Sequence, residues 1–157
     1  MNKPLITVVI PSLNHDKYIE KSITSVLNSK ISLEIFIMDG GSNDQTIDII
    51  KKWESKISGW RSFPDKGQAS AINEGIKLGT APFVCWLNSD DYYLENGLNT
   101  MLQMFKAYPA YTVVYGKAWN LIDKDNSYKP VKVEEFNERK MSKRCIISQP
   151  STLIRRT

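Results

Sequence analysis

The stretch FVCWLNSDD, residues 83–91, decides the fold, because an apolar run of strand length is followed directly by four polar residues. It places two carboxylates, Asp90 and Asp91, at the carboxyl end of a buried strand, where open α/β sheets hold their ligands. Adjacent carboxylates repel each other, and a hard divalent cation with oxygen ligands relieves that repulsion. The stretch therefore predicts a metal-bridged diphosphate. An ordinary solvated turn is the alternative, since Asn, Ser and Asp are common turn residues.

The amino-terminal part reads as two consecutive βα units. Residues 5–10 form a β-branched run closed by Pro11, and helical spacing of apolar residues follows, with Asp16 as the expected cap. Residues 34–38 form a second such run, followed by a polar loop and a helix from about Asp44. Successive βα units predict right-handed crossovers and a mainly parallel sheet.

The remaining sequence extends this pattern and then changes character. We expect a strand over 60–63 and a helix opening near Gln68, with Ala69, Ile72, Ile76 and Leu78 on its apolar side and Gly79 as its stop. A helix over 95–108 ends at Pro109. Beyond it, strands over 112–115, 118–122 and 128–133, with a turn at 123–126, indicate a smaller α+β portion.

Length and composition fit one globular domain. The 157 residues suffice for a single core, and 41% hydrophobic with 24% charged residues argues against disorder. A net charge of +4, spread along the chain, argues against a nucleic-acid partner but leaves contact with an anionic membrane surface open. We expect Cys85 and Cys145 in apolar strands with no disulfide or zinc site. The short amino-terminal apolar run is no membrane span, which predicts a cytoplasmic or at most peripheral protein.

Loops that follow parallel strands converge on one sheet edge, so we expect the loops at 11–14, 39–43, 65–68 and 88–91 to line one crevice. Asp39 precedes Gly40 and Gly41, which predicts a tight turn with the carboxylate facing a ligand donor such as a base imide or a ribose hydroxyl. A helix cap is the alternative role for Asp39. Gly67 opens a helix whose amides suit an anion.

In this order, the segments VIPSLN (9–14), IMDGGSNDQT (37–46), DKGQ (65–68) with AINEG (71–75), and WLNSDD (86–91) closely resemble family 2 glycosyltransferases. The segment SQPSTLIRR (148–156) resembles another stretch of these enzymes, so the likeness covers essentially the whole chain. It implies a GT-A fold as one domain over 1–157, with a Rossmann-like nucleotide-sugar half over 1–109 and an incomplete acceptor-side half over 110–157.

The resemblance also implies ligands and site residues. It implies a nucleotide-diphosphate sugar, a divalent cation (Mn²⁺ or Mg²⁺) held by Asp90, and a glycan or lipid-linked acceptor. The residues that match the family's nucleotide-sugar contacts are Pro11, Ser12, Asn14, Asp39, Asp65, Gly67, Gln68, Asn73 and Asn88. Asn88 and Gly40 both stand where the family more often has Asp. The departure at Gly40 leaves the base preference open.

The implied reaction is an inverting single displacement in which a carboxylate takes the acceptor hydroxyl's proton. The resemblance places that base after Gln149-Pro150, on a later helix, and the sequence ends at Thr157 before any such acid. Either the domain is truncated or the acidic residue comes from elsewhere. Only their position recommends Asp91 or Glu95, and we assign no base. Helix capping is an alternative role for Asp91.

Six further residues, at four places in the sequence, each have two possible roles. His15 is a substrate contact or an exposed helix-start residue, and either Tyr92 or Tyr93 meets a sugar while the other packs inward. Trp119 stacks on a sugar or packs in the core. The pair at 155–156 holds diphosphate or is frayed and solvated.

Two other functions compete with transfer. A nucleotide-sugar-binding module without turnover is motivated by the missing base. A dinucleotide-dependent oxidoreductase would also use βα repeats, but the loop after the first strand lacks the Gly-x-Gly-x-x-Gly pattern, and nicotinamide cofactors do not require an acidic loop.

Overall fold

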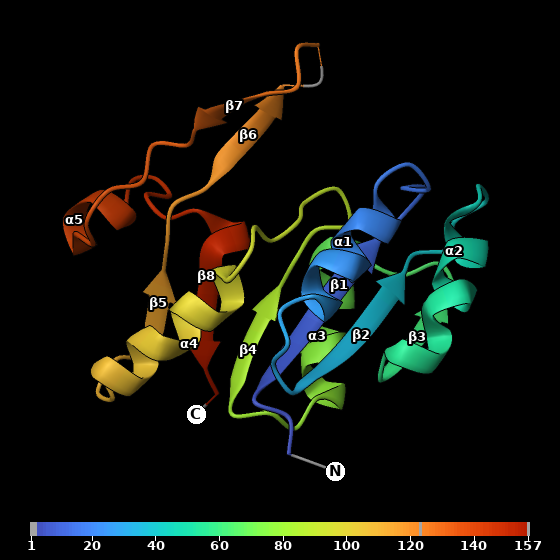
Figure 1. Cartoon of the computed structure of the whole chain (residues 1–157), viewed down its shortest axis with the longest axis horizontal. Coiled ribbons are helices and arrows are strands. Elements are labelled where there is room, and N and C mark those ends of the chain that lie inside the picture. The colour runs from blue at the N-terminus through green and yellow to red at the C-terminus, as the bar shows by residue number, and fades with distance from the viewer. Residues whose placement is uncertain (1–2, 123, 157) are drawn as a thin grey trace.

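A computed structural model describes residues 3–122 and 124–156 of the chain. Its centre is a six-stranded sheet (Figure 1), built from β1 (Ile6–Ser12), β2 (Leu33–Asp39), β3 (Gly59–Ser62), β4 (Phe83–Trp86), β5 (Val113–Tyr115) and β8 (Thr152–Arg155). The helices are α1 (Ile19–Leu27), α2 (Thr46–Trp53), α3 (Gln68–Leu78), α4 (Gly97–Ala107) and α5 (Glu138–Met141), with short 3-10 turns η1 (Glu54–Lys56) and η2 (Gln149–Ser151).

The strand order is β3-β2-β1-β4-β8-β5. The first four strands are parallel, as the βα repeats predict, and β8 runs antiparallel to both of its neighbours. The chain winds outward from β1 to β3 and then returns to place β4 on the other side of β1. This reversal between β1 and β4 is the switch point at which open α/β sheets form a crevice for ligands. The expected α/β sheet is confirmed.

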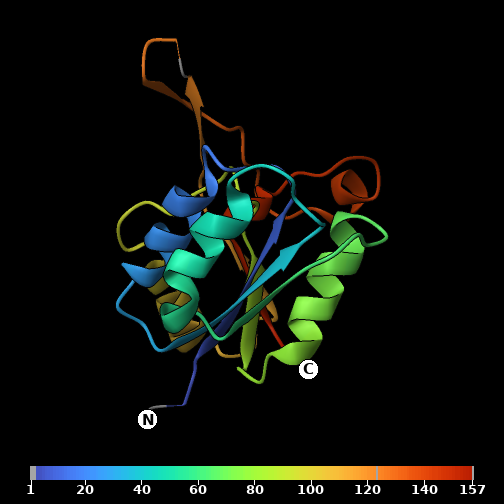
Figure 2. The same cartoon turned by 90° about the vertical axis from the view of Figure 1, so that its right-hand side faces the viewer.

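Side chains that alternate along the strands build two apolar layers. On β1, Ile6, Val8 and Ile10 face a large core with residues of α1, α2 and α4, whereas Val9 faces a smaller core with Ala71 of α3. This period of two is what a strand buried on both faces requires. Figure 2 shows α1 and α2 on one side of the sheet and α3 on the other.

Helix α3 contacts the sheet through small residues. A Cβ added at Gly75 would lie 2.6 Å from Val9 Cγ1, and one at Gly79 would meet Thr7 at 2.3 Å. The expected apolar side was wrong in part, since Ala69 and Leu78 are exposed. Gly79 follows the helix as expected, but with φ −80° it is needed for space rather than for a left-handed turn.

Pro11 explains where the acidic loop leaves the sheet. Strand β1 pairs with β2 as far as Ser12 but with β4 only as far as Val9, whose carbonyl accepts a hydrogen bond from Leu87 N. Along a strand, the backbone groups of every second residue face the same neighbouring strand. After Val9, the next residue that faces β4 is Pro11, which has no N–H to donate to it. The chain after Leu87 is thereby released at the switch point.

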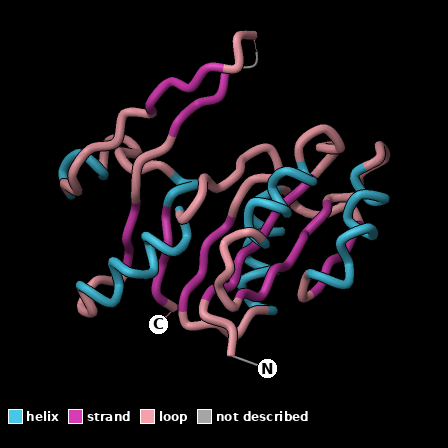
Figure 3. The backbone as a smooth tube through the Cα atoms, in the orientation of Figure 1, coloured by secondary structure: helices cyan, strands magenta, loops and turns pink. Residues whose placement is uncertain are grey.

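The carboxyl-terminal segment completes the sheet and adds a hairpin. Strands β5 and β8 extend the same sheet, while β6 (Trp119–Ile122) and β7 (Ser127–Pro130) form the expected antiparallel hairpin, which rises beyond the carboxyl-terminal sheet edge (Figure 3). The predicted turn at 123–126 includes Asp123, which lies outside the described residues.

Three expectations for single residues in the sequence were wrong. Asp16 does not cap α1, because that helix begins at Ile19 after a turn. Cys145 is exposed in a loop. The 155–156 pair is not frayed: the Arg156 guanidinium donates to the carbonyls of Ile76 and Ala81, which ties the segment after β8 to the end of α3.

Candidate functional site

The loops after β1 and β2 are joined by direct hydrogen bonds. Asn14 N donates to Ser42 Oγ (2.8 Å), and Asn43 N donates to Asn14 Oδ1 (2.9 Å). Asn14 has φ 54°, a left-handed conformation that Asn tolerates better than most residues. The Asn14 side chain therefore fixes the shape of the crevice wall.

The loop after β4 is joined to the loop after β1 and to the start of α3. His15 Nδ1 lies 2.5 Å from Ser89 Oγ, across the switch point, and Gln68 Nε2 donates to Asn88 Oδ1 (2.8 Å). We expected His15 to be either a substrate contact or an exposed helix-start residue. The structure shows a half-buried residue that links two loops of the site. The predicted convergence of these loops on one edge is confirmed.

The carboxylate of Asp39 is fully buried and is used by its own surroundings. Oδ2 accepts hydrogen bonds from Gly41 N, Ser42 N and Ser62 Oγ at 2.9, 2.8 and 2.6 Å, and Oδ1 accepts from Ser42 Oγ at 2.5 Å. We expected this carboxylate to face a ligand, and the structure instead shows it closing the loop after β2. Its four partners belong to that loop and to β3, so the alternative of a simple helix cap does not describe it either.

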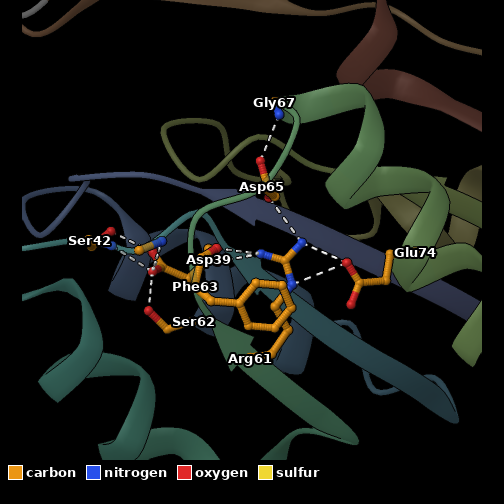
Figure 4. Close-up of polar contacts among 9 residues, drawn as sticks. Asp39, Ser42, Arg61, Ser62, Phe63, Asp65, Gly67 and Glu74 are labelled. Atoms are coloured by element: carbon orange, nitrogen blue, oxygen red, sulfur yellow. Dashed lines mark hydrogen bonds and ion pairs between the residues drawn. The ribbon is translucent and has the colours of Figure 1, made fainter.

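Arg61 on β3 organises the next wall (Figure 4). Its guanidinium is an ion-pair partner of Asp65 (3.0 Å) and Glu74 (2.7 Å), donates to the Asp39 carbonyl, and lies 4.4 Å from the centre of the Phe63 ring. Asp65 also accepts from Gly67 N (2.7 Å). The carboxylate that we expected to meet base or diphosphate therefore positions the loop leading into α3, and both carboxylates raise the pKa of Arg61.

The two carboxylates of the acidic loop differ in environment. Asp90 is exposed, and within the described part of the chain its side chain has no hydrogen-bond or ion-pair partner. Asp91 is half-buried and accepts a hydrogen bond from Asn88 Nδ2 (3.2 Å). Burial and the adjacent Asp90 raise the pKa of Asp91. It does not cap the next helix, since α4 begins at Gly97 after Asn96.

The donor set at this loop fits a divalent cation that arrives with its ligand. Among the residues the structure describes, no three His, Cys, Asp or Glu side chains converge to form a ready-made cage. Mg²⁺ usually keeps several waters and takes one or two carboxylates plus substrate phosphates, for which one exposed, unpaired carboxylate is sufficient. In this loop Asp90 is the carboxylate that is exposed and has no side-chain partner among the described residues.

The remaining predicted site residues differ in burial and in backbone conformation. Pro11 and Ser12 end β1 at the switch point, and Ser12 Oγ is buried without a hydrogen-bond partner among the described residues. Gly67 caps α3 with φ 96°, which only glycine adopts readily. Asn73 is exposed two residues from both Ala71 and Gly75, about 200° around the helix, and so points away from the sheet.

Sequence reasoning missed the residues that hold the site together, namely Ser42, Arg61, Ser62 and Gln149 as hydrogen-bond donors. Gln149 Nε2 donates to the carbonyl of Trp86 (2.7 Å), which attaches the segment before β8 to the end of β4. Hydroxyl and guanidinium groups at strand ends carry no spacing signal.

The tyrosine alternatives are resolved. The Tyr93 hydroxyl donates to Cys85 Sγ (3.5 Å) and its ring packs on the large core, whereas the Tyr92 hydroxyl lies 2.8 Å from that of Tyr128 on the hairpin. Tyr92 is the outward-facing residue. Trp119 is 44% exposed, so the core-packing reading for it was wrong.

The sequence model described as Glycosyl transferase family 2 matches residues 7–155, nearly all of the chain and every loop described above. The chain belongs to glycosyltransferase family 2. An uncharacterised glycosyltransferase of Haemophilus influenzae is 34% identical over 66% of this chain and 44% of its own length. A Campylobacter jejuni enzyme, GalNAc(5)-diNAcBac-PP-undecaprenol beta-1,3-glucosyltransferase, is 28% identical over 96% of this chain and 48% of its own. The chain thus spans under half of these two relatives.

Solved structures support the GT-A fold of this family 2 member. Residues 1–349 of Staphylococcus aureus TarS, in complex with UDP-GlcNAc, superpose with a TM-score of 0.75 at 20% identity, covering 96% of this chain and 45% of that one. The mannosyltransferase PcManGT of Pyrobaculum calidifontis, in complex with GDP-Man and Mn²⁺, gives a TM-score of 0.64 at 20% identity over 73% of this chain and 36% of that one. In the described part of the family 2 chain, no helix is both long and apolar enough to cross a membrane.

Proposed function

We propose that this chain carries the donor site of a glycosyltransferase, which binds a nucleotide-diphosphate sugar with a divalent cation and transfers the sugar to a glycan or lipid-linked acceptor. The family assignment supports transfer as the reaction class. The observation that carries the proposal is geometric. Hydrogen bonds join the loops after β1, β2 and β4 at the switch point, and beside them the Asp90 carboxylate is exposed and has no partner among the residues that the structure describes.

Each residue of the site has a task in this proposal. The exposed Asn14 and the loop after β2 that it holds border the base and ribose, while Gln68 and Asn88, bonded to each other, border the diphosphate. The first turn of α3 offers free N–H groups, which favour an anion. Asp39 and Asp65 act indirectly, by fixing the loops that make these contacts.

Asp90 would hold the cation. When bound, Mn²⁺ or Mg²⁺ neutralises charge on the departing diphosphate, a contribution of several kcal/mol in such sites. Asp91, hydrogen-bonded to Asn88, keeps the acidic loop in shape beside it. We assign no general base to the described residues, and acceptor deprotonation stays outside this proposal.

The relatives narrow the panel of donors to test. UDP-GlcNAc is bound by TarS and GDP-Man by PcManGT, so uridine and guanosine diphosphates and their sugars come first. The acceptor named for the Campylobacter enzyme is lipid-linked, which makes peripheral contact with a membrane part of the proposal for the whole protein.

Calorimetric titration of these diphosphates and sugar conjugates, in Mn²⁺, in Mg²⁺ and in EDTA, tests the donor site. We expect one nucleotide to bind with an affinity that EDTA lowers strongly. Absence of binding under every condition would refute the proposal. Turnover is a separate measurement: release of nucleoside diphosphate with acceptor distinguishes a transferase from a binding module without turnover.

A further inference from the structure

The segment between β7 and η2 concentrates positive charge, although basic residues occur along the whole chain. Residues 132–144, which we call the basic loop, contain five Lys or Arg and three Glu residues, a net charge of +2. The loop therefore carries half of the net charge of +4 of the whole chain. Figure 1 shows its helix α5 beyond β5, at the far end of the sheet from β3. The basic loop is thus a local positive patch.

Glu134 gives the basic loop a fixed shape. Its carboxylate forms ion pairs with Lys140 (2.8 Å) and Arg144 (2.6 Å), and its side chain is only 14% exposed. Its main chain joins the two ends of the loop, because Glu134 N donates to the carbonyl of Ile146 (3.3 Å). The Glu134 carbonyl accepts from the Tyr115 hydroxyl on β5 (3.0 Å). The loop is therefore closed on itself and attached to the sheet.

The closed loop leaves apolar and basic side chains exposed together. Phe136 is 67% exposed, more than any other large apolar side chain in the described part of the chain, and Met141 is 36% exposed. Arg139 and Lys143 are exposed, and their side chains have no ion-pair partner among the described residues. A single exposed apolar residue is common on protein surfaces. An exposed ring beside unpaired cations, on a loop held in shape, is a more specific combination.

This combination favours one kind of partner. Unpaired cations favour an anionic partner, and an exposed ring favours an apolar one. A bilayer with anionic lipids offers both within a few ångströms of depth, because phosphates lie at its surface and acyl chains lie beneath them. A soluble polyanion would pair with the cations but would leave the Phe136 ring in water. The loop therefore fits a lipid surface better than a nucleic acid or another soluble polyanion.

We propose that the basic loop is a docking surface for a membrane that contains anionic phospholipids. Phe136 and Met141 enter the interface between headgroups and acyl chains, and Arg139 and Lys143 pair with lipid phosphates. Reversible binding is expected, since one ring and a few charges are weak signals that act together. The loop shares no residue with the donor site. The membrane contact proposed above for the whole protein thereby gains a specific surface on this chain.

Sedimentation of the full chain with lipid vesicles tests this surface. We expect binding to vesicles of phosphatidylcholine mixed with phosphatidylglycerol, and none to phosphatidylcholine alone. Phe136→Ala should lower the apparent affinity about tenfold through lost apolar burial, and Arg139→Gln combined with Lys143→Gln should lower it at least about tenfold through lost charge. High salt should weaken binding of the wild-type protein, because it screens the charges.

Two variants outside the loop are the matched controls. Tyr111→Ala removes a ring that is 53% exposed, and Lys77→Gln combined with Lys106→Gln removes two exposed cations. Both should bind vesicles as the wild-type protein does. A charge-pair variant of the loop that binds no more weakly than the Lys77 and Lys106 variant would show that net charge alone attracts the chain, which overturns the proposal.

Two other results also overturn it. In the first, the wild-type protein does not bind the anionic vesicles. In the second, Phe136→Ala binds them as well as the wild-type protein, which would indicate a soluble polyanion or an acidic protein as the partner. Calorimetry with nucleotide separates these failures from failure of the donor site, because unchanged nucleotide affinity in the loop variants shows that they are folded. A wild-type protein that binds vesicles but no nucleotide would contradict the donor site alone.

Discussion

His15 and Ser89 are joined across the switch point of the sheet, with His15 Nδ1 2.5 Å from Ser89 Oγ. The first residue follows β1 and the second follows β4, so this contact sets the spacing of the two loops between which the ligand is proposed to bind. Ser89 is only 1% exposed, and the contact is shielded from water.

Because His15 and Ser89 share one hydrogen bond, we expect the two single variants and the double variant to lose a similar amount of stability. We expect His15→Ala and Ser89→Ala each to lower the free energy of unfolding by about 1 kcal/mol, the usual net value of one hydrogen bond. The double variant should then lose little more than either single one. Urea unfolding of all four proteins gives the coupling energy. Additive losses would show that the two side chains do not interact in solution.

Replacing Asp39 should act on stability before it acts on binding. Asp39→Asn leaves the volume unchanged but places an amide N–H₂ among the buried donors of Ser42, Ser62 and Gly41. We expect a loss of about 3 kcal/mol, because hydrogen bonds to a buried carboxylate are strong and the orphaned donors stay buried. Urea unfolding measures it. Unchanged stability with weakened nucleotide binding would instead make Asp39 a direct ligand contact.

Gly75→Ala should destabilise the chain, although the same change in an exposed helix stabilises it by about 1 kcal/mol. The new Cβ would lie 2.6 Å from Val9 Cγ1, and overpacking of this kind costs about 1–3 kcal/mol. Thermal unfolding shows whether Gly75→Ala lowers or raises the stability of the protein. Adding Val9→Ala should remove part of the effect. Asn73→Ala, on the exposed side of the same helix, is the control and should be nearly neutral.

The sequence predicted those features that repeat or cluster. Alternating and helical apolar patterns indicated β1 to β4 and the parallel order, and Asp and Gly after strands indicated the crevice edge. It did not predict that β8 would insert between β4 and β5, because an antiparallel insertion depends on distant partners. It predicted the packed side of α3 only in part: Ile76 packs against the sheet as expected, but Gly75 and Gly79, which carry no hydrophobic signal, allow the closest approach.

At the site, the sequence identified the loops but not which carboxylates stay free. Asp39, Asp65 and Asp90 look alike as Asp residues after strands. The structure distinguishes them by partners: Asp39 bonds serines that are 3 and 23 residues away, Asp65 pairs with Arg61, and Asp90 has no partner among the described residues. The Asp39–Ser62 contact depends on tertiary structure, which no local pattern encodes, and the Asp39–Ser42 and Asp65–Arg61 contacts are local but carry no recognisable spacing signal.

Asp91 should make stability depend on pH in a predictable direction. Its pKa is raised above the ordinary 3.8 by burial and by Asp90, so the folded state binds a proton more readily than the unfolded state. The stability contribution of this group is therefore present at low pH and is lost as pH rises through the raised pKa. In EDTA, the Asp91→Asn variant should be more stable than the wild-type protein at neutral pH. This difference in stability should become smaller as the pH falls.

Asp125→Asn is the control with the opposite sign. Hydrogen bonds from Ser127 lower the pKa of Asp125, so its contribution is present above the ordinary 3.8 and is lost as pH falls through the lowered value. Urea unfolding of both variants over the same pH series should give slopes of opposite sign relative to wild type. Parallel slopes would contradict the assignment for Asp91.

Asp90→Asn should separate metal-dependent binding from folding. It removes the exposed, unpaired carboxylate and the charge that faces Asp91, so we expect unfolding stability to stay equal or to rise slightly. The gain in diphosphate affinity that Mn²⁺ gives the wild-type protein should vanish in calorimetry, because one fewer anionic oxygen remains for the cation. Asp48→Asn, an equal charge change on the exposed side of α2, should keep that gain. If both variants kept it, the cation would be held elsewhere, and the acidic loop would be the solvated turn that its four residues also allow.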